Sequence, residues 1–324
     1  MTMEEIAKAL GVSKSTVSRA LSGKGRIGKE TAEKIQKYVQ ENIFFNNSAL
    51  TGCIGVVIPA DSYTTSIPYF HECLLGISGA AAVMQYNVMI LADSPESYGI
   101  MTSLVNRHKI DGFILMRNRE EDRIMKFLTD IHFPTGLTGQ CAYEDVIQVD
   151  VDNRSASFTL SSMLMDRGFR SFAVVMGNST YQVNFDRIAG FQEAESQYGL
   201  SQSAQRIYAN IITSDQVDHI ISECKAKKIE CIICGDDVIC TWVMSGLQSS
   251  YIRIPQDIAV VSLYNSANLD CFTPAVTAIS MPAKRMGNMV ARQLINKIIG
   301  NEYDVKTFLD YEILFRKSSE FLNR

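Results

Sequence analysis

The first 45 residues and the rest of the chain differ in how their hydrophobic residues are spaced. Near the start, apolar residues recur every three or four positions, as on one face of an α-helix: Met3, Ile6, Ala7 and Leu10. Gly11 then favours a turn, and Ser13 is placed to cap a second helix with Val17 on its buried face. A third helix is predicted over about 29–41. This part of the chain is therefore predicted to be a small all-α domain.

After residue 53 the pattern changes to short apolar runs separated by segments of helical length. We predict strands at Ile54–Ile58, Val88–Ala92, Gly112–Met116, Pro134–Leu137, Val146–Val149, Phe172–Met176, Gln205–Tyr208, Cys231–Cys234 and Ile258–Leu263. Alternating strands and helices form parallel sheets that are covered by helices. Because the alternation restarts at Phe172, the sequence predicts an α/β body of two similar lobes with a cleft between them.

The polar face of the second helix carries groups that suit the major groove of DNA. Cations and hydroxyls share this face at spacings of three and four residues: Lys14, Ser15, Ser18, Arg19 and Ser22. Arginine can donate two hydrogen bonds to one guanine, and hydroxyls bind phosphates or base edges. The alternative is a solvated helical hairpin in some other α domain, because helix-turn-helix geometry also occurs outside DNA-binding proteins.

The segment from Gly11 to Leu21 reads Gly-Val-Ser-x-x-Thr-Val-Ser-Arg-x-Leu. With the preceding Ile6-Ala7-Lys8, it resembles the headpiece of the lactose/galactose repressor family of transcriptional regulators. The resemblance implies a helix-turn-helix domain that reads a pseudo-palindromic operator in double-stranded DNA. Contacts with DNA are expected from the second helix and the loop that follows it: Ser13, Lys14, Ser15, Thr16, Ser18, Arg19, Ser22 and Arg26.

The loop after the second helix, Gly23 to Gly28, fits the pattern G-x-G-x-x-G of dinucleotide-binding folds. No strand precedes it and no βαβ unit surrounds it, so we do not interpret it as a dinucleotide site. We expect instead a basic loop that brings Arg26 and the start of the third helix to a DNA phosphate.

The resemblance continues through the body. The matching segments are Ile54–Pro59, Val151–Asn153, Arg187–Phe191, Asp237, Pro274–Ile279 and Leu314–Ser318. They imply two lobes of the periplasmic-binding-protein type, linked by three crossovers and binding a small-molecule effector between them. We expect the headpiece at 1–45, a hinge at 46–53 and the body at 54–324. Within the body, the first lobe would take about 54–150 and 280–305, and the second about 151–279 and 306–324. No leucine heptad follows Arg316, which favours a homodimer over a tetramer.

The expected hinge is short. Asn46 is followed by seven residues before Ile54, where the family usually has about thirteen. In the family, a hinge helix wedges a leucine into the minor groove and kinks the duplex. Leu50 is the residue of this chain that would play that part, on a helix of barely one turn.

The resemblance also places effector-binding residues in the cleft. Tyr69 and Phe70 open the first helix of the body, where aromatic side chains cover the ligand, and Arg187 would bind its hydroxyls or carboxylates. Asp236 would also reach the ligand. The alternatives are core packing for the two aromatic residues and a surface ion pair for Arg187. Tyr264 stands where the family has a carboxylate, which argues against a simple hexose as the effector.

The charge of the chain is divided unevenly. Residues 1–50 contain eight Lys and Arg against five Asp and Glu, a net charge of +3. The rest of the chain contains 23 against 30, a net charge of −7. A basic headpiece on an acidic body is expected if only the headpiece contacts DNA.

Other classes of function lack their residues in this sequence. The eight cysteines are not spaced as a disulfide framework, and the four histidines lack metal-ligand spacing. No catalytic motif is present, so we expect neither an enzyme nor a cofactor. Glu4 and Glu5 replace the basic start of a signal peptide, and no apolar run is long enough to span a membrane. We therefore expect a cytoplasmic regulator. A solute-binding protein and a constitutive DNA binder whose cleft has lost its ligand are the alternatives.

Overall fold

The computed structural model describes residues 3–324 apart from 23–27, 29–30, 33, 36–37, 39–49, 95, 120–121, 201–205 and 321–324. Its N-terminal domain begins with α1 (Met3–Leu10) and α2 (Lys14–Ser22), joined at Gly11, which has a positive φ of 64°. The amide of Thr16 donates to the hydroxyl of Ser13 at 3.1 Å, which confirms the predicted cap. The buried residues of this domain are Ile6, Ala7, Val17, Ala20 and Ile35. Residues 31–32, 34–35 and 38 of the predicted third helix are helical, and the rest of that helix lies outside the described residues.

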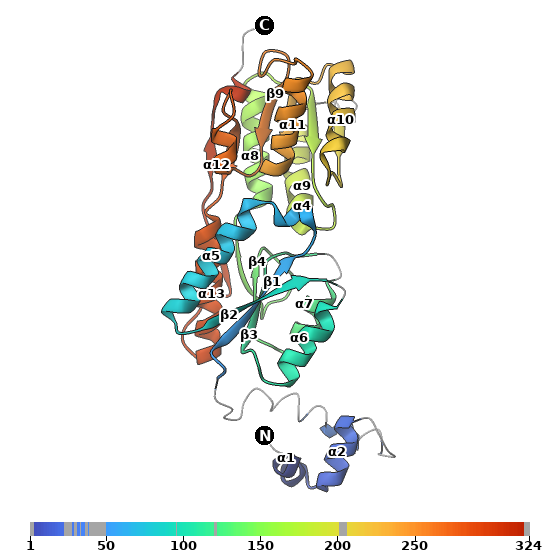
Figure 1. Cartoon of the computed structure of the whole chain (residues 1–324), viewed down its shortest axis with the longest axis vertical. Coiled ribbons are helices and arrows are strands. Elements are labelled where there is room, and N and C mark those ends of the chain that lie inside the picture. The colour runs from blue at the N-terminus through green and yellow to red at the C-terminus, as the bar shows by residue number, and fades with distance from the viewer. Residues whose placement is uncertain are drawn as a thin grey trace.

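The first lobe of the body is a parallel sheet of six strands in the order β11-β5-β4-β3-β1-β2 (Figure 1). Its strands are β1 (Cys53–Pro59), β2 (Asn87–Asp93), β3 (Gly112–Leu115), β4 (Thr135–Thr138), β5 (Ile147–Asp150) and β11 (Lys306–Phe308). One face packs against α5 (Pro68–Val83) and α13 (Ala283–Ile299), and the other against α6 (Ser97–Asn106) and α7 (Arg123–Asp130). The predicted α/β lobe is therefore confirmed.

The second lobe repeats this architecture with the order β12-β10-β9-β8-β6-β7. Its strands are β6 (Phe172–Val175), β7 (Arg206–Tyr208), β8 (Cys231–Cys234), β9 (Ala259–Ser262), β10 (Thr277–Ser280) and the antiparallel β12 (Glu312–Leu314). One face packs against α8 (Asn153–Asp166) and α9 (Gln182–Gln197), and the other against α10 (Ser214–Ala226) and α11 (Asp237–Ser249). The shorter helices are α4 (Ser62–Thr65), α12 (Ala267–Asp270) and the 3-10 helix Lys317–Ser319.

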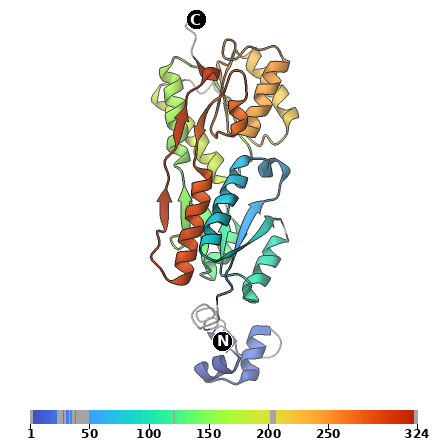
Figure 2. The same ribbon diagram turned by 60° about the vertical axis from the view of Figure 1, so that its left-hand side comes forward.

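The chain passes between the lobes three times, as the resemblance implied (Figure 2). The first two crossovers follow β5 and β10, close to the predicted boundaries. The third was predicted after residue 305, but Lys306–Phe308 pairs with β5 in the first sheet. This crossover therefore lies between Phe308 and Glu312. The predicted end of the hinge is also corrected, because Cys53 already pairs with β2.

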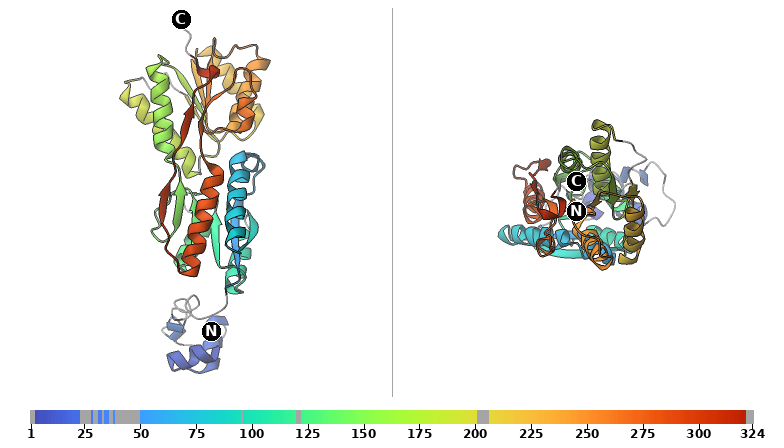
Figure 3. Two further views of the ribbon diagram at one scale, coloured as in Figure 1. Left: turned by 90° about the vertical axis from the view of Figure 1, so that its left-hand side faces the viewer. Right: turned by 90° about the horizontal axis from the view of Figure 1, so that it is seen from above.

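Helices α5 and α13 lie side by side at very close range (Figure 3). The approach depends on Gly76 and Gly287, because a Cβ at Gly287 would overlap the carbonyl oxygen of Cys73 and one at Gly76 would overlap that of Lys284. These atoms belong to helix backbones, which cannot rotate away as a side chain can. The glycines therefore set the distance between the two helices that cover one face of the first sheet.

We expect Gly287→Ala to lower the free energy of unfolding by about 3 kcal/mol, the upper part of the range for overpacked cores, because the added methyl group meets backbone. Chemical denaturation of the full chain measures this effect. The matched control is Gly99→Ala in α6, where an added Cβ has open space and should stabilise the helix slightly. Equal stability of the two variants would contradict this account of the close packing.

Candidate functional site

The outer face of α2 carries the polar residues that the sequence predicted. Lys14, Ser15 and Arg19 are exposed, Thr16 and Ser18 are partly exposed, and the intervening Val17 and Ala20 are buried. The hydroxyl of Ser13 lies 2.8 Å from that of Ser15 and 2.7 Å from that of Thr16. The side chain of Ser22 and all of Arg26 lie outside the described part of the chain. The structure thus gathers hydroxyls and two cations on one face of α2.

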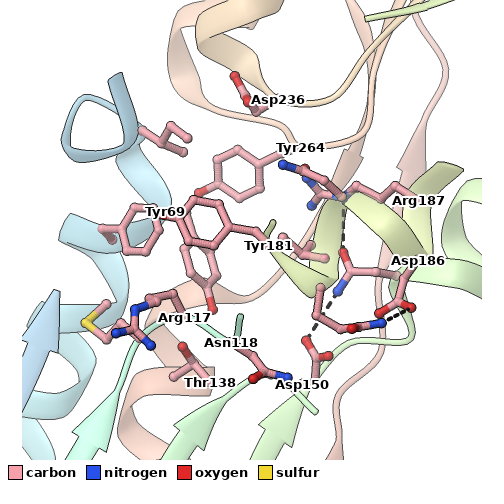
Figure 4. A pocket seen from close by; sticks show the side chains of 18 of the residues that line it. Tyr69, Arg117, Asn118, Thr138, Asp150, Tyr181, Asp186, Arg187, Asp236 and Tyr264 are labelled. Carbon is pink, nitrogen blue, oxygen red and sulfur yellow. Dashed lines mark hydrogen bonds between the residues drawn. The ribbon is translucent and has the colours of Figure 1, made fainter. Parts of the chain in front are cut away.

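A cavity lies between the lobes, at the carboxyl ends of the strands of both sheets (Figure 4). The first lobe contributes residues after β1, β3, β4 and β5, and the second contributes the start of α9 and the loops after β8, β9 and β10. All five residues predicted to bind the effector line it: Tyr69, Phe70, Arg187, Asp236 and Tyr264. The fold therefore brings together residues from four separate segments of the sequence.

Arg187 is buried on α9, so the alternative that it forms an ion pair on the surface is wrong. Its Nε donates to the side-chain oxygen of Asn153 at 3.2 Å, and one terminal nitrogen donates to the carbonyl oxygen of Gly235 at 2.8 Å. Burial lowers the pKa of its guanidinium from the ordinary value, and the carboxylates of Asp236 and Asp150 oppose that change. The protein thus holds this guanidinium rigidly against the cleft without a direct ion pair among the described residues.

Asp236 is also buried, two residues after the end of β8. Its Oδ1 accepts the amide hydrogen of Ile239 at 3.0 Å and so caps α11. Its Oδ2 accepts a hydrogen bond from the hydroxyl of Tyr63, a residue of the first lobe. Burial raises the pKa of Asp236, while the bond from Tyr63 lowers it. Both carboxylate oxygens therefore already have protein donors.

Aromatic rings form one side of the cavity. The ring of Tyr69 meets Phe70 edge to face at a centroid distance of 5.3 Å and meets Tyr264 in the same way at 6.0 Å. Tyr69 and Phe70 also pack against the core of the first lobe, so the same two residues belong to the core and line the cavity. The hydroxyl of Tyr264 is buried and has no hydrogen-bond partner in the described structure. It is a free donor for a polar ligand.

The sequence reasoning missed Asp150, a carboxylate at the end of β5 that also lines the cavity. Its neighbours are neutral amides: Gln140 and Asn153 each donate at 3.3 Å. Burial raises the pKa of Asp150 to about 6. The signal was present in the sequence, since Asp150 directly follows a predicted buried strand and so had to lie at the ligand-binding edge of the sheet.

Arg117, also in the cavity wall, is neutralised within the first lobe. Its Nε lies 2.7 Å from a carboxylate oxygen of Asp93, and a terminal nitrogen pairs with Asp122. Three further carboxylates line the cavity, those of Asp150, Asp186 and Asp236, and Arg187 is the one other arginine among the described residues of its lining. The cleft is therefore acidic, which favours an uncharged or cationic ligand over an anion.

The lobes touch each other at the rim of the cavity. The guanidinium of Arg119 lies over the ring of Tyr181, 5.2 Å from its centroid, and donates to its hydroxyl at 3.1 Å. The amide of Gln182 donates to the carbonyl oxygen of Asn118 at 3.2 Å. These contacts, with the bond between Tyr63 and Asp236, join the lobes in a closed arrangement.

None of the His, Cys, Asp and Glu side chains of the described residues form a group of three or more that could hold a metal ion. All eight cysteines are free thiols, five of them buried. In the described residues no helix is both long enough and apolar enough to cross a membrane.

Comparison with known proteins is consistent with both parts of the site. Residues 2–47 match the family described as bacterial regulatory proteins, lacI family, and residues 162–319 match the periplasmic binding protein-like domain. The HTH-type transcriptional regulator MalR of Staphylococcus xylosus is 28% identical, with 93% of this chain and 92% of MalR aligned. The regulator RegA of Clostridium saccharobutylicum is 24% identical over 98% of this chain and 99% of RegA.

Solved structures share the fold. A complex of the transcriptional regulator CelR with cellobiose superposes with a TM-score of 0.74 at 22% identity, covering 98% of this chain and 99% of CelR. A probable maltose operon repressor from Staphylococcus areus gives a TM-score of 0.77 at 22% identity, covering 84% of this chain and 99% of the repressor. This chain therefore carries a helix-turn-helix headpiece of the bacterial regulatory proteins, lacI family, joined to a two-lobed periplasmic binding protein-like body.

Proposed function

We propose that the protein is a cytoplasmic, homodimeric repressor that binds a pseudo-palindromic operator and responds to a small polar, sugar-like effector between its lobes. The observation that carries the proposal is the cleft, where a buried, rigidly held Arg187 faces aromatic rings and unpaired polar groups. The headpiece in the same chain supplies the DNA-binding part. A solute-binding protein would need only the body, so the lacI-family headpiece argues against that alternative.

The operator contacts are assigned to α2 and its flanks: Ser13, Lys14, Ser15, Thr16, Ser18, Arg19, Ser22 and Arg26. Exposure of the described members of this set supports the assignment. Leu50 keeps its proposed part as the minor-groove wedge, since 53% of its surface is exposed and available to insert.

The homodimer would form through the first lobe. Apolar side chains are exposed there on α5 and on the neighbouring edge strand β2: Leu75 by 50%, Val83 by 72% and Ile90 by 52%. Exposed apolar side chains that gather on one face mark a protein interface. A second copy of this surface would cover them and place two headpieces on the two halves of an operator.

The effector class follows from the acidic cleft and its aromatic wall. Rings such as Tyr69 and Tyr264 pack against sugar rings, and carboxylates such as Asp150 accept hydrogen bonds from sugar hydroxyls. Two similar solved structures are a probable maltose operon repressor and a complex of CelR with cellobiose. Maltose and cellobiose are therefore the first probes.

The experiment has two arms. Selection from random duplexes identifies the operator, and a thermal shift screen with neutral sugars and sugar phosphates identifies the effector, because a ligand of the folded cleft raises the Tm. The effector should then release the operator in a fluorescence anisotropy titration. If no sugar changes operator binding, the alternative of a constitutive regulator would be favoured. The hydrogen bond from Tyr63 to Asp236 supports that alternative, because it occupies a residue expected to bind the effector.

Binding to DNA should weaken steeply with salt, because each neutralised phosphate releases counterions. The slope of log affinity against log salt is about −0.9 per phosphate, and six to ten contacts lower the affinity roughly 10³- to 10⁵-fold between about 50 and 200 mM salt. Lys14 and Arg26 are the cations expected to contribute, and Lys14→Gln should make the slope shallower. An affinity that stays constant over this range would exclude the proposed phosphate contacts.

A further inference from the structure

Tyr63 belongs to the first lobe by sequence but to the second by packing. It lies on α4, which follows β1 and reaches the boundary between the lobes (Figure 1). Asp61 holds this short helix in place by accepting the amide hydrogen of Thr64 at 2.7 Å. The side chain of Tyr63 is only 7% exposed and is part of the hydrophobic cluster formed by α10, α11 and the second sheet.

The second lobe provides a fitted socket for this side chain. The ring of Tyr63 lies 5.8 Å from that of Trp242 on α11, and its hydroxyl donates to Asp236. Gly177, two residues after the end of β6, makes room, because a Cβ there would lie 2.6 Å from the hydroxyl oxygen of Tyr63. Three residues from two segments of the second lobe, α11 with its cap and the loop after β6, thus contact one side chain of the first.

This socket is one end of the proposed effector cleft. Asp236 was expected to bind the effector, yet Tyr63 and the amide of Ile239 occupy its two oxygens. The hydroxyl of Tyr63 is therefore positioned at Asp236 as a ligand hydroxyl would be. Arg187, Asp150 and the hydroxyl of Tyr264 at the remainder of the cleft keep positions that face the cavity.

We propose that Tyr63 is an internal occupant of the Asp236 end of the cleft, which links the two lobes in the absence of effector and directs the effector to the part of the cleft lined by Arg187, Asp150 and Tyr264. The inference rests on the proposed function of the cleft. A ligand that takes Asp236 must displace Tyr63 and break the link, whereas a ligand held by Arg187, Asp150 and Tyr264 leaves it in place. Tyr63 therefore determines both which end of the cleft is open to a ligand and whether the lobes stay together.

The chain carries its own reporter of this contact. Trp242 is its single tryptophan, so intrinsic fluorescence excited at the indole band reports on the socket alone. Small-angle X-ray scattering of the full-length protein reports on lobe separation through the radius of gyration. Neither measurement requires DNA or an identified effector, so a failure here is distinguishable from a failure of the proposed function.

Two variants on opposite lobes should have the same effect. Tyr63→Ala removes the occupant, and Gly177→Ala places a methyl group where the tyrosine hydroxyl lies. Both should shift the emission of Trp242 to longer wavelength and increase the radius of gyration of the ligand-free protein. The matched control is Tyr143→Ala, an exposed tyrosine of the first lobe, which should change neither quantity. Wild-type values for both Tyr63→Ala and Gly177→Ala would overturn the proposal.

Tyr63→Phe removes the hydroxyl and keeps the ring, so it tests the two contributions separately. It also provides a test if the alanine variants fail to fold. It should keep the ring against Trp242 and the emission near that of the wild type, while the lost bond to Asp236 increases the radius of gyration part of the way. A Tyr63→Phe protein as compact as the wild type would show that the hydroxyl does not link the lobes.

Discussion

Arg19→Ala is expected to abolish the preference of the dimer for its operator over random DNA. Arg19 is exposed on the outer face of α2, whose inner face is fixed by the buried Val17 and Ala20. A bidentate contact with guanine contributes about 1–3 kcal/mol of discrimination, and a dimer makes it in each half-site. The loss is therefore roughly 30-fold to 10⁴-fold in the ratio of the two affinities.

Fluorescence anisotropy with operator and random duplexes, at one fixed salt concentration, measures that ratio. Lys34→Ala is the matched control, since it removes one exposed cation from the third helix of the same domain. It should weaken binding to both duplexes alike, because a phosphate contact carries no sequence information. If Arg19→Ala kept the wild-type ratio, α2 would not be the recognition helix.

The strands of the body could be predicted because most of them are buried on both faces. In β3, β6, β8 and β9 all four residues are buried, so each appears in the sequence as an uninterrupted apolar run. Three strands were not predicted: β10, β11 and β12. Among them, β11 has the sequence Lys-Thr-Phe, and its first and last residues are exposed at the edge of the sheet. An edge strand of three residues has no hydrophobic run, and for this reason the third crossover was placed too early.

The residues of the cleft differ in how far the sequence predicted them. Arg187 and Asp236 were found from the resemblance to the family, and Asp150 could have been found from its place after a predicted strand. Tyr63 could not, because it is a single aromatic residue in a polar loop and its partner Asp236 is 173 positions away. Hydrophobic periodicity reports only which face of an element is buried, whereas this contact depends on how two lobes meet.

Arg187→Ala is expected to remove the response to the effector while operator binding by the ligand-free protein stays near that of the wild type. The guanidinium faces the cavity, and its position is set by the carbonyl oxygen of Gly235 and the side chain of Asn153. Truncation removes the donors for the ligand and leaves two buried acceptors unpaired, which also lowers stability by about 1–3 kcal/mol. Arg187→Lys should not restore the response, because an ammonium group lacks the planar fork of donors.

The readout is the effector concentration that releases half of the operator, measured by anisotropy with the sugar identified in the thermal shift screen. The matched control is Arg154→Ala on the adjacent α8, where the side chain is 54% exposed and pairs with Glu193 outside the cavity. Its loss should leave the half-release concentration unchanged, because an exposed ion pair contributes little and does not contact the ligand. A ligand that is bound by this guanidinium must bind more weakly when the guanidinium is removed. If Arg187→Ala released half of the operator at the same effector concentration as the wild type, the effector would therefore bind elsewhere.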